Sequence, residues 1–167
     1  MRLRRPSLPA EVAARVDGRP LAFARAVDGT WVVGTRAALV VLGADQARHV
    51  PWERVEGADW DRETSRLRVS EVGHYGQARP AYSFTMPDSE PGGLLQLIRE
   101  RVTASVVLQR GRLVNGKRGL KVIGRRSPVG GPIAWMHEYD DGIDPDDPEV
   151  AAVAAALLEQ ARADVGE

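Results

Sequence analysis

Short apolar runs alternate with turn residues through the first half of the chain. Between Leu21 and Met86 each run spans only a few residues, and Gly, Pro or Asp separates it from the next one. Parallel strands need crossover connections of about a dozen residues or more, whereas antiparallel strands can be joined by tight turns. The dipeptide Asp28-Gly29 is typical of such a two-residue hairpin turn. This spacing therefore predicts an antiparallel sheet.

The rest of the chain adds three further strands and two helices. A first helix at 91–102 has an apolar stripe at helical spacing, and Asp88 or Ser89 can cap it. The predicted strands are Leu21–Val27, Thr30–Gly34, Ala38–Leu42, Arg48–Pro51, Arg54–Trp60, Leu67–Val72, Tyr82–Met86, Val106–Val114, Leu120–Arg126 and Ile133–Tyr139.

The second helix begins with a strong start signal. In Asp147–Glu149 an Asp caps the helix, Pro occupies its first position and an acid follows in the first turn. Its apolar face includes Leu157 and Leu158, which we expect to be buried against the sheet. The order of strands, helix, strands and helix predicts the class α+β. We expect a mainly antiparallel β structure, folded as a partly open barrel or sandwich, with two principal helices.

The length of 167 residues fits a single domain over 1–167. We expect a core β-sheet region at 20–104, followed by an appended three-strand meander and C-terminal helix at 105–164. The chain has no cysteine, which excludes disulfides, thiolate zinc sites and cysteine nucleophiles. A chain of this size can bury a sizeable core without covalent staples.

Three features of the first two thirds of the chain carry a family resemblance. They are the run of strands from Leu21 to Met86, the segment His49–Glu56 and the closing amphipathic helix at 91–102. On these features, residues 20–104 resemble a bacterial pleckstrin-homology-like domain. The resemblance implies a scaffold that binds peptides, proteins or anionic head groups and is not, as a rule, an enzyme.

The later part of the chain carries a second resemblance. Arg101–Leu108, together with Trp135 and Asp144–Pro148, is similar to a group of small uncharacterised actinobacterial proteins. The strands and the helix after residue 104 depart from a minimal pleckstrin-homology-like domain. No functional residue is therefore carried over from that family.

Charge is segregated along the chain, although the formal net charge is zero. Residues 101–126 carry eight basic and no acidic side chains, whereas residues 127–167 carry one basic and ten acidic ones. The basic hairpin, residues 105–126, is the best candidate for a binding site. Its candidate residues for an anion or a partner are Arg110, Arg112, Lys117, Arg118, Lys121, Arg125 and Arg126.

Two interpretations of the basic hairpin stay open. Arg110 and Arg112 share one face of the first strand, and Lys121 and Arg125 share one face of the second. These side chains could bind an external anion, because a cationic ribbon attracts phosphates. Alternatively, the acidic segment 138–149 could neutralise them within the fold and leave no free anion site. Few aromatic residues interleave with the arginines, which argues against stacking on single-stranded nucleic acid.

No pattern in the sequence points to catalysis or to a metal. His49, His74 and His137 are not spaced as ligands within one element, and no Gly-x-Ser-x-Gly nucleophile elbow is present. His137 is interpreted as a packed, hydrogen-bonded residue. A calcium loop that starts at Asp140 fails because its twelfth position is Ala151, so these acids are interpreted as a turn and a helix cap. We expect no enzyme activity, no metal and no cofactor; a hydrolase triad assembled from distant residues is the least favoured alternative.

The leading hypothesis is a non-enzymatic binding or scaffold module whose partner is a protein. The alternative is an anion-binding module for nucleic acid or acidic lipid that uses the basic hairpin. No apolar run reaches the ~18–20 residues of a membrane span. The basic start Met1–Pro6 is not followed by the apolar core of a signal peptide. We therefore expect a cytoplasmic protein without an integral membrane segment.

Overall fold

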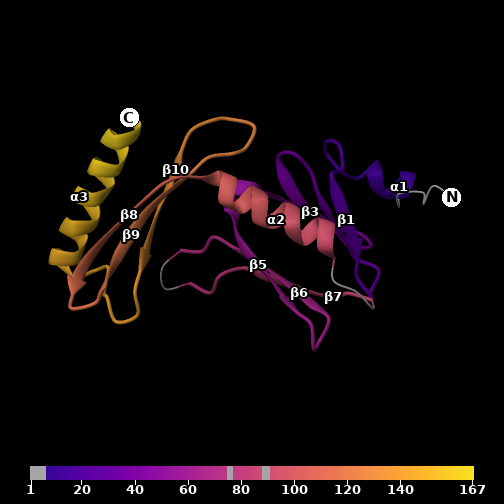
Figure 1. The fold of residues 1–167 in the computed structure, drawn as a ribbon, viewed down its shortest axis with the longest axis horizontal. Coiled ribbons are helices and arrows are strands. Elements are labelled where there is room, and N and C mark those ends of the chain that lie inside the picture. Colours follow the sequence, from indigo (N-terminus) through magenta and orange to yellow (C-terminus); the bar gives the residue numbers. More distant parts are fainter. Residues whose placement is uncertain (1–6, 75–76, 88–90) are drawn as a thin grey trace. The chain divides into compact units, whose positions relative to one another are not determined.

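The computed structural model describes residues 7–74, 77–87 and 91–167 (Figure 1). Three sequence expectations fall elsewhere: the basic start Met1–Pro6 and the helix caps Asp88 and Ser89 lie outside the described residues.

The chain divides into two compact units. Unit 1 comprises residues 1–72 and 79–103, and unit 2 comprises residues 73–78 and 104–167. Each unit has its own sheet structure and its own principal helix, so each is described by itself. The interpretation of the whole chain as one domain stays a prediction.

Unit 1 contains two antiparallel sheets whose strands follow one another in sequence order. The first sheet consists of β1 (Ala22–Arg25), β2 (Trp31–Gly34), β3 (Ala38–Leu42) and β4 (Ala47–Pro51), and the second of β5 (Val55–Asp61), β6 (Arg66–Glu71) and β7 (Ala81–Thr85). In the β1–β2 turn, Gly29 has a φ of +89° and the Thr30 N–H donates to Asp28 Oδ1 at 2.9 Å. The antiparallel meander and a turn at Asp28-Gly29 are therefore confirmed, but the loop has three residues and not two, because the Ala26 N–H donates to the carbonyl oxygen of Thr30.

Both sheets and helix α2 (Gly92–Ser105) share one hydrophobic core in unit 1. Trp52, in a short 3-10 helix at Trp52–Arg54, is fully buried, and its Nε1 donates to the carbonyl oxygen of Thr35 at 2.9 Å. Leu94 and Ile98 of α2 belong to the same cluster. Burying such a side chain stabilises the fold by about 1.5–3 kcal/mol. The apolar stripe of α2 is therefore the face that packs into this core.

A short helix lies against the opposite side of the first sheet. Helix α1 spans Ala10–Ala13, and its Val12 clusters with Val33 of β2 and Val40 of β3. Side chains alternate along a strand, so β2 and β3 contribute one set of valines to this cluster and another to the main core. Both faces of the first sheet are thus covered within unit 1.

Unit 2 is a three-stranded antiparallel sheet with a helix against it. Helix α3 (Pro148–Val165) contacts β8 (Val106–Asn115) and β9 (Arg118–Arg125), and Figure 1 shows it lying along one side of the sheet. Asp147 Oδ1 accepts a hydrogen bond from the Glu149 N–H at 2.8 Å, which confirms the predicted helix start. The elements are β8 (Val106–Asn115), β9 (Arg118–Arg125), β10 (Ala134–Tyr139) and α3 (Pro148–Val165), with the strand order β10-β9-β8.

The core of unit 2 lies between α3 and its sheet. Leu157 is buried beside Leu120 and Val122 of β9, as expected. Leu158 is only partly buried, so the expectation of full burial is wrong for this residue. Consecutive residues on a helix are about 100° apart, so the two leucines cannot both point straight at the sheet.

These elements confirm the class α+β with mainly antiparallel strands and two principal helices, α2 and α3. The described residues form ten strands in three sheets, and they form no closed barrel. Among the helices in the described ranges, none combines the length and the apolar character that crossing a membrane requires.

Candidate functional site

The pairing register decides which way the side chains of the basic hairpin point. In an antiparallel pair, residues directly opposite each other project to the same face of the sheet. Arg110 pairs with Val122 and Arg112 pairs with Leu120, and both apolar partners belong to the cluster against α3. Arg110 and Arg112 therefore share the face of the sheet on which α3 lies.

Lys121 and Arg125 share the other face of the sheet. They alternate along β9 with Leu120 and Val122, which point toward α3, and Lys121 pairs with Gly111. The two pairs of cations that the sequence singled out are thus on opposite faces. The hairpin does not present its candidate residues as one cationic surface.

Two of the candidate cations have acidic partners within unit 2. Arg110 Nη2 lies 3.0 Å from Asp164 Oδ2 of α3, and Lys121 Nζ lies 3.6 Å from Glu138 Oε2 of β10. All four side chains are at least one third exposed, so each pair stabilises by only about 0–1 kcal/mol. The partner of Lys121, Glu138, therefore belongs to the acidic segment 138–149, whereas the partner of Arg110, Asp164, lies outside this segment.

Arg125 is not on the surface. Only 5% of this residue is exposed, and its Nη1 donates to Ser105 Oγ at 3.1 Å. Sequence alternation placed Arg125 on the same face of β9 as Lys121, and the structure shows that Arg125 is buried there. This burial removes Arg125 from the candidate surface.

The acidic segment meets the hairpin at its turn. Arg118 Nη1 donates to the carbonyl oxygen of Asp141 at 3.0 Å, and the Gly119 N–H donates to Asp140 Oδ2 at 2.7 Å. The two segments are therefore adjacent, as the neutralisation hypothesis requires. In each of these two contacts one partner is a backbone group. Among the described residues, no ion pair joins a carboxylate of the segment 138–149 to Arg110 or Arg112.

Three candidate cations are exposed and lack both an ion-pair and a side-chain hydrogen-bond partner among the residues that the structure describes: Arg112, Lys117 and Arg126. Arg118 is exposed and has no ion-pair partner in the described ranges either, but it donates to the carbonyl oxygen of Asp141. Arg112 lies on β8, Lys117 lies in the turn, and Arg126 follows β9. Of these three, Arg112 alone belongs to a strand.

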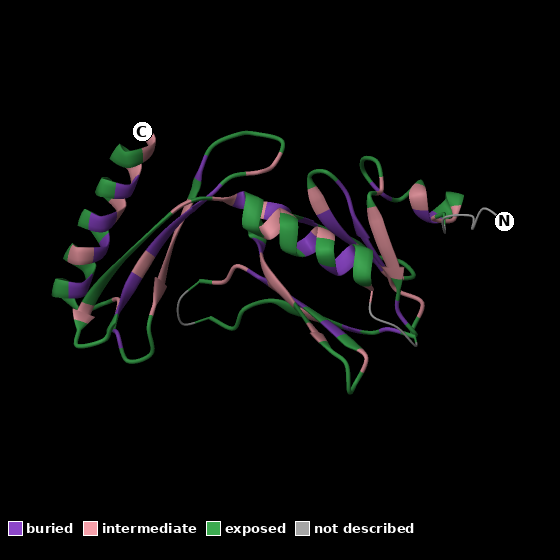
Figure 2. Ribbon diagram, in the orientation of Figure 1, coloured by how far each residue is buried: buried purple, intermediate pink, exposed green. Residues whose placement is uncertain are grey.

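Strand β8 forms the outer edge of its sheet. One edge of β8 pairs with β9, and its other edge pairs with no strand in the described part of the chain. Every residue from Gln109 to Leu113 is exposed, whereas β9 is mostly buried (Figure 2). Such an edge carries backbone N–H and C=O groups that can hydrogen-bond an added strand.

A hollow of about 320 Å³ with a mostly apolar lining lies over the β8–β9 hairpin. Gly111 leaves part of this space open, because a Cβ there would meet Lys121 Cγ only at an ordinary 3.5 Å. Gly119 is needed for a different reason: a Cβ there would lie 1.9 Å from the carbonyl oxygen of Arg112. The hollow also includes Leu113, Leu120 and Asp140 among its lining residues.

No known protein family, curated protein or solved structure matches this chain. The candidate site therefore rests on its own geometry: an exposed outer strand, a hollow beside it and an accessible cation, Arg112, on the strand.

The histidines are placed apart from one another. His137 Nε2 lies 3.3 Å from the carbonyl oxygen of Ala154, and its ring stacks on Tyr139 at 6.1 Å, which confirms a packed, hydrogen-bonded residue. His49 and His74 are exposed, in β4 and in a loop. Among the described residues, no three His, Asp or Glu side chains are grouped closely enough to hold a metal ion.

The acidic loop before α3 forms a turn and a cap, as interpreted from the sequence. Asp144 Oδ1 accepts from the Asp146 N–H at 2.9 Å, and Asp147 accepts from the first backbone N–H groups of α3. A second hollow of about 290 Å³ lies here and is lined by Asp144, Asp147 and Glu149 among others. Two of its carboxylates, those of Asp144 and Asp147, already accept hydrogen bonds from backbone N–H groups.

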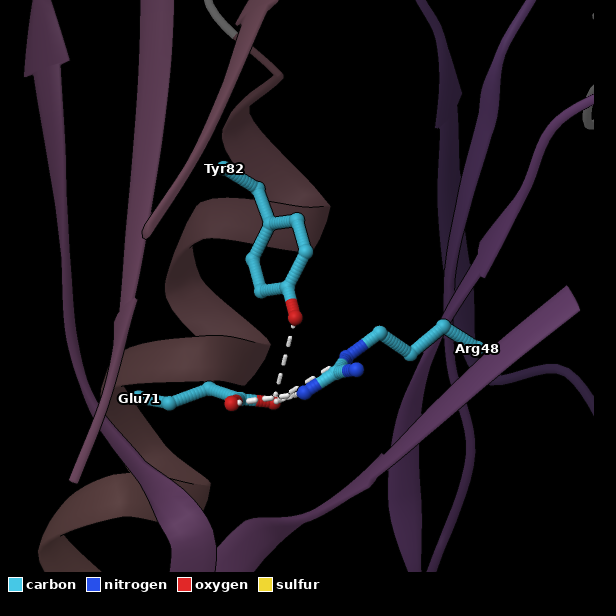
Figure 3. A network of polar contacts seen from close by, with 3 residues as sticks. All are labelled: Arg48, Glu71 and Tyr82. Carbon is cyan, nitrogen blue, oxygen red and sulfur yellow. Dashed lines mark hydrogen bonds and ion pairs between the residues drawn. The ribbon is translucent and has the colours of Figure 1, made fainter. Parts of the chain in front are cut away.

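Sequence reasoning missed a polar network in unit 1 (Figure 3). Glu71 of β6 is buried, and both its carboxylate oxygens accept from Arg48 Nη2 of β4, at 2.9 and 2.8 Å. Tyr82 of β7 donates to Glu71 Oε1 at 3.3 Å, and the Arg48 guanidinium lies 5.4 Å from the Tyr82 ring centroid. The network joins the first sheet to the second.

The network also changes the acid–base properties of its members. Hydrogen bonds to Glu71 raise the pKa of Arg48 above its ordinary value. Burial, and then the negative charge of Glu71, raise the pKa of Tyr82. Arg48, Glu71 and Tyr82 lie far apart in sequence, and no local sequence pattern predicts that they are in contact. The network links the two sheets of unit 1, because both carboxylate oxygens of Glu71 accept hydrogen bonds from Arg48 on the other sheet.

Proposed function

We propose that this chain is a non-enzymatic binding module whose partner is a protein, and that a segment of the partner adds to the outer edge of β8. The observation that carries the proposal is the exposure of Gln109–Leu113 on an outer strand beside a hollow. Extended peptides bind sheet edges through backbone hydrogen bonds, and pockets for alternate side chains supply specificity. β8 offers both a backbone edge that pairs with no strand of the described residues and a hollow lined in part by its own residues.

The architecture of unit 1 supports a scaffold. Four antiparallel strands, three further antiparallel strands and a closing helix share one core, which supports our proposal of a pleckstrin-homology-like fold. That resemblance implies binding and not catalysis. We further propose a cytoplasmic location, since a chain without cysteine suits a reducing compartment. The actinobacterial origin stays a prediction.

The second candidate function is an anion-binding module for nucleic acid or acidic lipid. The accessible cations Arg112, Lys117 and Arg126 favour it, because exposed cations contribute to phosphate binding. The distribution of the other four candidates weakens it. Arg125 is buried and Arg110 has a partner on α3, so a polyanion would meet few free charges on either face. We therefore favour the protein partner.

Proline substitution tests the edge directly. Successive backbone N–H groups along a strand point to opposite edges, so only one of Gln109→Pro and Arg110→Pro removes a bond to β9. The variant that keeps the wild-type melting temperature is the one that blocks the outer edge. Affinity capture from lysate of the source cell, with and without nuclease, then compares that variant with the wild-type chain.

A protein captured by the wild-type chain and lost with the edge-blocked variant, irrespective of nuclease, supports the proposal. Retention of the same protein by the edge-blocked variant contradicts it. Captured nucleic acid that nuclease removes, together with binding that falls steeply as salt is added, favours the anion-binding alternative.

A further inference from the structure

We infer that the segment bound at the edge of β8 is an extended acidic peptide, in which acidic side chains alternate with apolar ones. This inference rests on the function proposed above and names the chemistry of its partner. Three features of unit 2 lead to it: the cations of β8, the disfavoured pairing of two β8 strands and the hollow on the other face.

The cations of β8 would lie beside the side chains of an added strand on the same face of the sheet. Arg110 and Arg112 are two residues apart, so they project from the same face of the edge strand. Side chains directly opposite each other on neighbouring strands interact, and opposite charges there are favourable. Arg112 has no ion-pair partner in the described ranges, and the partner of Arg110, Asp164, is itself 37% exposed. An added strand with carboxylates at alternate positions would pair with both arginines.

The same cations disfavour a second copy of the chain as the occupant. If two β8 strands paired antiparallel about Gly111, each Arg110 would lie opposite the Arg112 of the other copy. Pairing about Arg110 would place the two copies of that residue opposite each other. Like charges directly opposite are destabilising, and charged side chains commonly protect edges from such pairing. An acidic strand avoids this repulsion between arginines and would compete with Asp164 for Arg110.

The other face of β8 supplies the apolar half of the pattern. Residues of an added strand that lie between the acidic ones would point to the face of Gly111 and Leu113. There the hollow of about 320 Å³ opens beside Gly111, and Leu113 is 66% exposed. An apolar side chain entering this space would remove both its own surface and that of Leu113 from water. Lys121, which also lines the hollow, adds a cation at its margin.

The test is an unbiased selection on the full chain. A displayed library of random twelve-residue peptides is selected on the wild-type protein, and the enriched peptides are sequenced. We expect an excess of Asp and Glu at alternate positions, with apolar residues between them. Hydrogen exchange of the complex should show new protection of β8 amides, because strand addition occupies their outward N–H groups.

Charge reversals provide the matched comparison. Arg112→Glu and Lys117→Glu change the net charge equally, but Lys117 lies in the turn and not on the edge. For the best enriched peptide, Arg112→Glu should weaken binding about tenfold and Lys117→Glu by less than about threefold. Gly111→Val, which fills the hollow from the strand itself, should also weaken binding.

The possible failures separate the two proposals. Enriched peptides that protect β8 but carry no acidic excess, or that respond equally to both charge reversals, overturn the acidic peptide and leave the edge-binding module standing. Peptides that leave β8 amides unprotected, or a selection that enriches none, overturn both. Heparin or anionic vesicles that bind the chain and are lost with Arg112→Glu, in the absence of any peptide, assign the edge to the anion-binding alternative.

Discussion

Units 1 and 2 use the same local pieces, antiparallel sheets and an amphipathic helix, but assemble them differently. In unit 1 two sheets and α2 enclose a shared core, and Arg48, Glu71 and Tyr82 join one sheet to the other. In unit 2 α3 packs against one sheet, and the outer strand β8 stays exposed over Gln109–Leu113. Contacts between sheets thus serve stability in unit 1, whereas unit 2 keeps an edge that can serve binding.

Ion pairs sharpen the comparison. The Glu71 side chain is 7% exposed and holds Arg48 through both its oxygens, whereas Asp164 is 37% exposed and holds Arg110 through one. Water competes for both charges of the second pair and for only one charge of the first. Burial of the carboxylate, and not the distance between the charges, is what distinguishes the two pairs.

The largest expected effect concerns the core of unit 2. Leu157→Ala should lower the free energy of unfolding by ~2–5 kcal/mol, because it leaves a cavity between α3 and β9. Leu158→Ala, one residue further along and only partly buried, is the matched control and should cost less than half as much. Urea unfolding followed by circular dichroism measures both. Equal losses, or no loss with Leu157→Ala, would contradict the docking of α3 on this side chain.

The hairpin offers a matched pair of glycines. Gly119→Ala should destabilise the chain by about 2–3 kcal/mol, because its Cβ would collide with the β8 backbone at Arg112. Gly111→Ala meets only ordinary contacts and should change stability by less than about 1 kcal/mol. Thermal unfolding of the two variants checks the difference. If Gly111→Ala proves the more damaging, the space beside β8 is not open as described.

Removal of each arginine tests the comparison between the two ion pairs. Arg48→Ala leaves the buried carboxylate of Glu71 without its bidentate partner and should cost about 2 kcal/mol, a value lowered because Arg48 itself is half exposed. Arg110→Ala should cost under about 1 kcal/mol. Chemical denaturation in low and high salt distinguishes them, since only the second loss should be screened. A similar cost for both would show that burial of Glu71 does not set the strength of its pair.

The smallest expected effect is a pH dependence in unit 1. The pKa of Tyr82 is raised in the folded protein by burial and by Glu71. A raised pKa means that stability is complete below the unfolded value near 10 and is lost as pH rises through the folded value. The wild-type chain should therefore lose stability more steeply above about pH 10 than Tyr82→Phe does. Tyr139, whose pKa burial also raises, is present in both proteins and cancels from the difference.

Denaturant midpoints measured from pH 8 to 11 provide the readout for this comparison. Parallel pH profiles of the wild-type chain and Tyr82→Phe would show that the raised pKa of Tyr82 contributes nothing to the alkaline sensitivity.

Local signals in the sequence were sufficient for the elements themselves. Asp28-Gly29 predicted a turn, Asp147 predicted a helix cap and the apolar stripe at 91–102 predicted α2, and all three are present. Each depends on side chains and backbone groups within a few residues of one another. Such short-range energetics are readable without knowing the fold.

The candidate site was predictable only in part, for the opposite reason. The sequence identified the basic hairpin and the alternation of its cations. It could not show that the strand register sets Arg110 against Val122, that Arg125 is buried, or that Arg110 reaches Asp164, 54 residues away. Alternation assigns side chains to faces of a strand but does not say which face a distant helix covers.

The sequence alone therefore determined the class of the fold, the order of its strands and helices and the segregation of its charge. Tertiary structure decided which charges are buried, which are paired and which edge is open. The Arg48–Glu71–Tyr82 network exists because β4, β6 and β7 meet, and the edge of β8 is open to a further strand because no strand of the described residues pairs with it. Burial and pairing depend on which distant segments come together, and that choice is made by the whole chain.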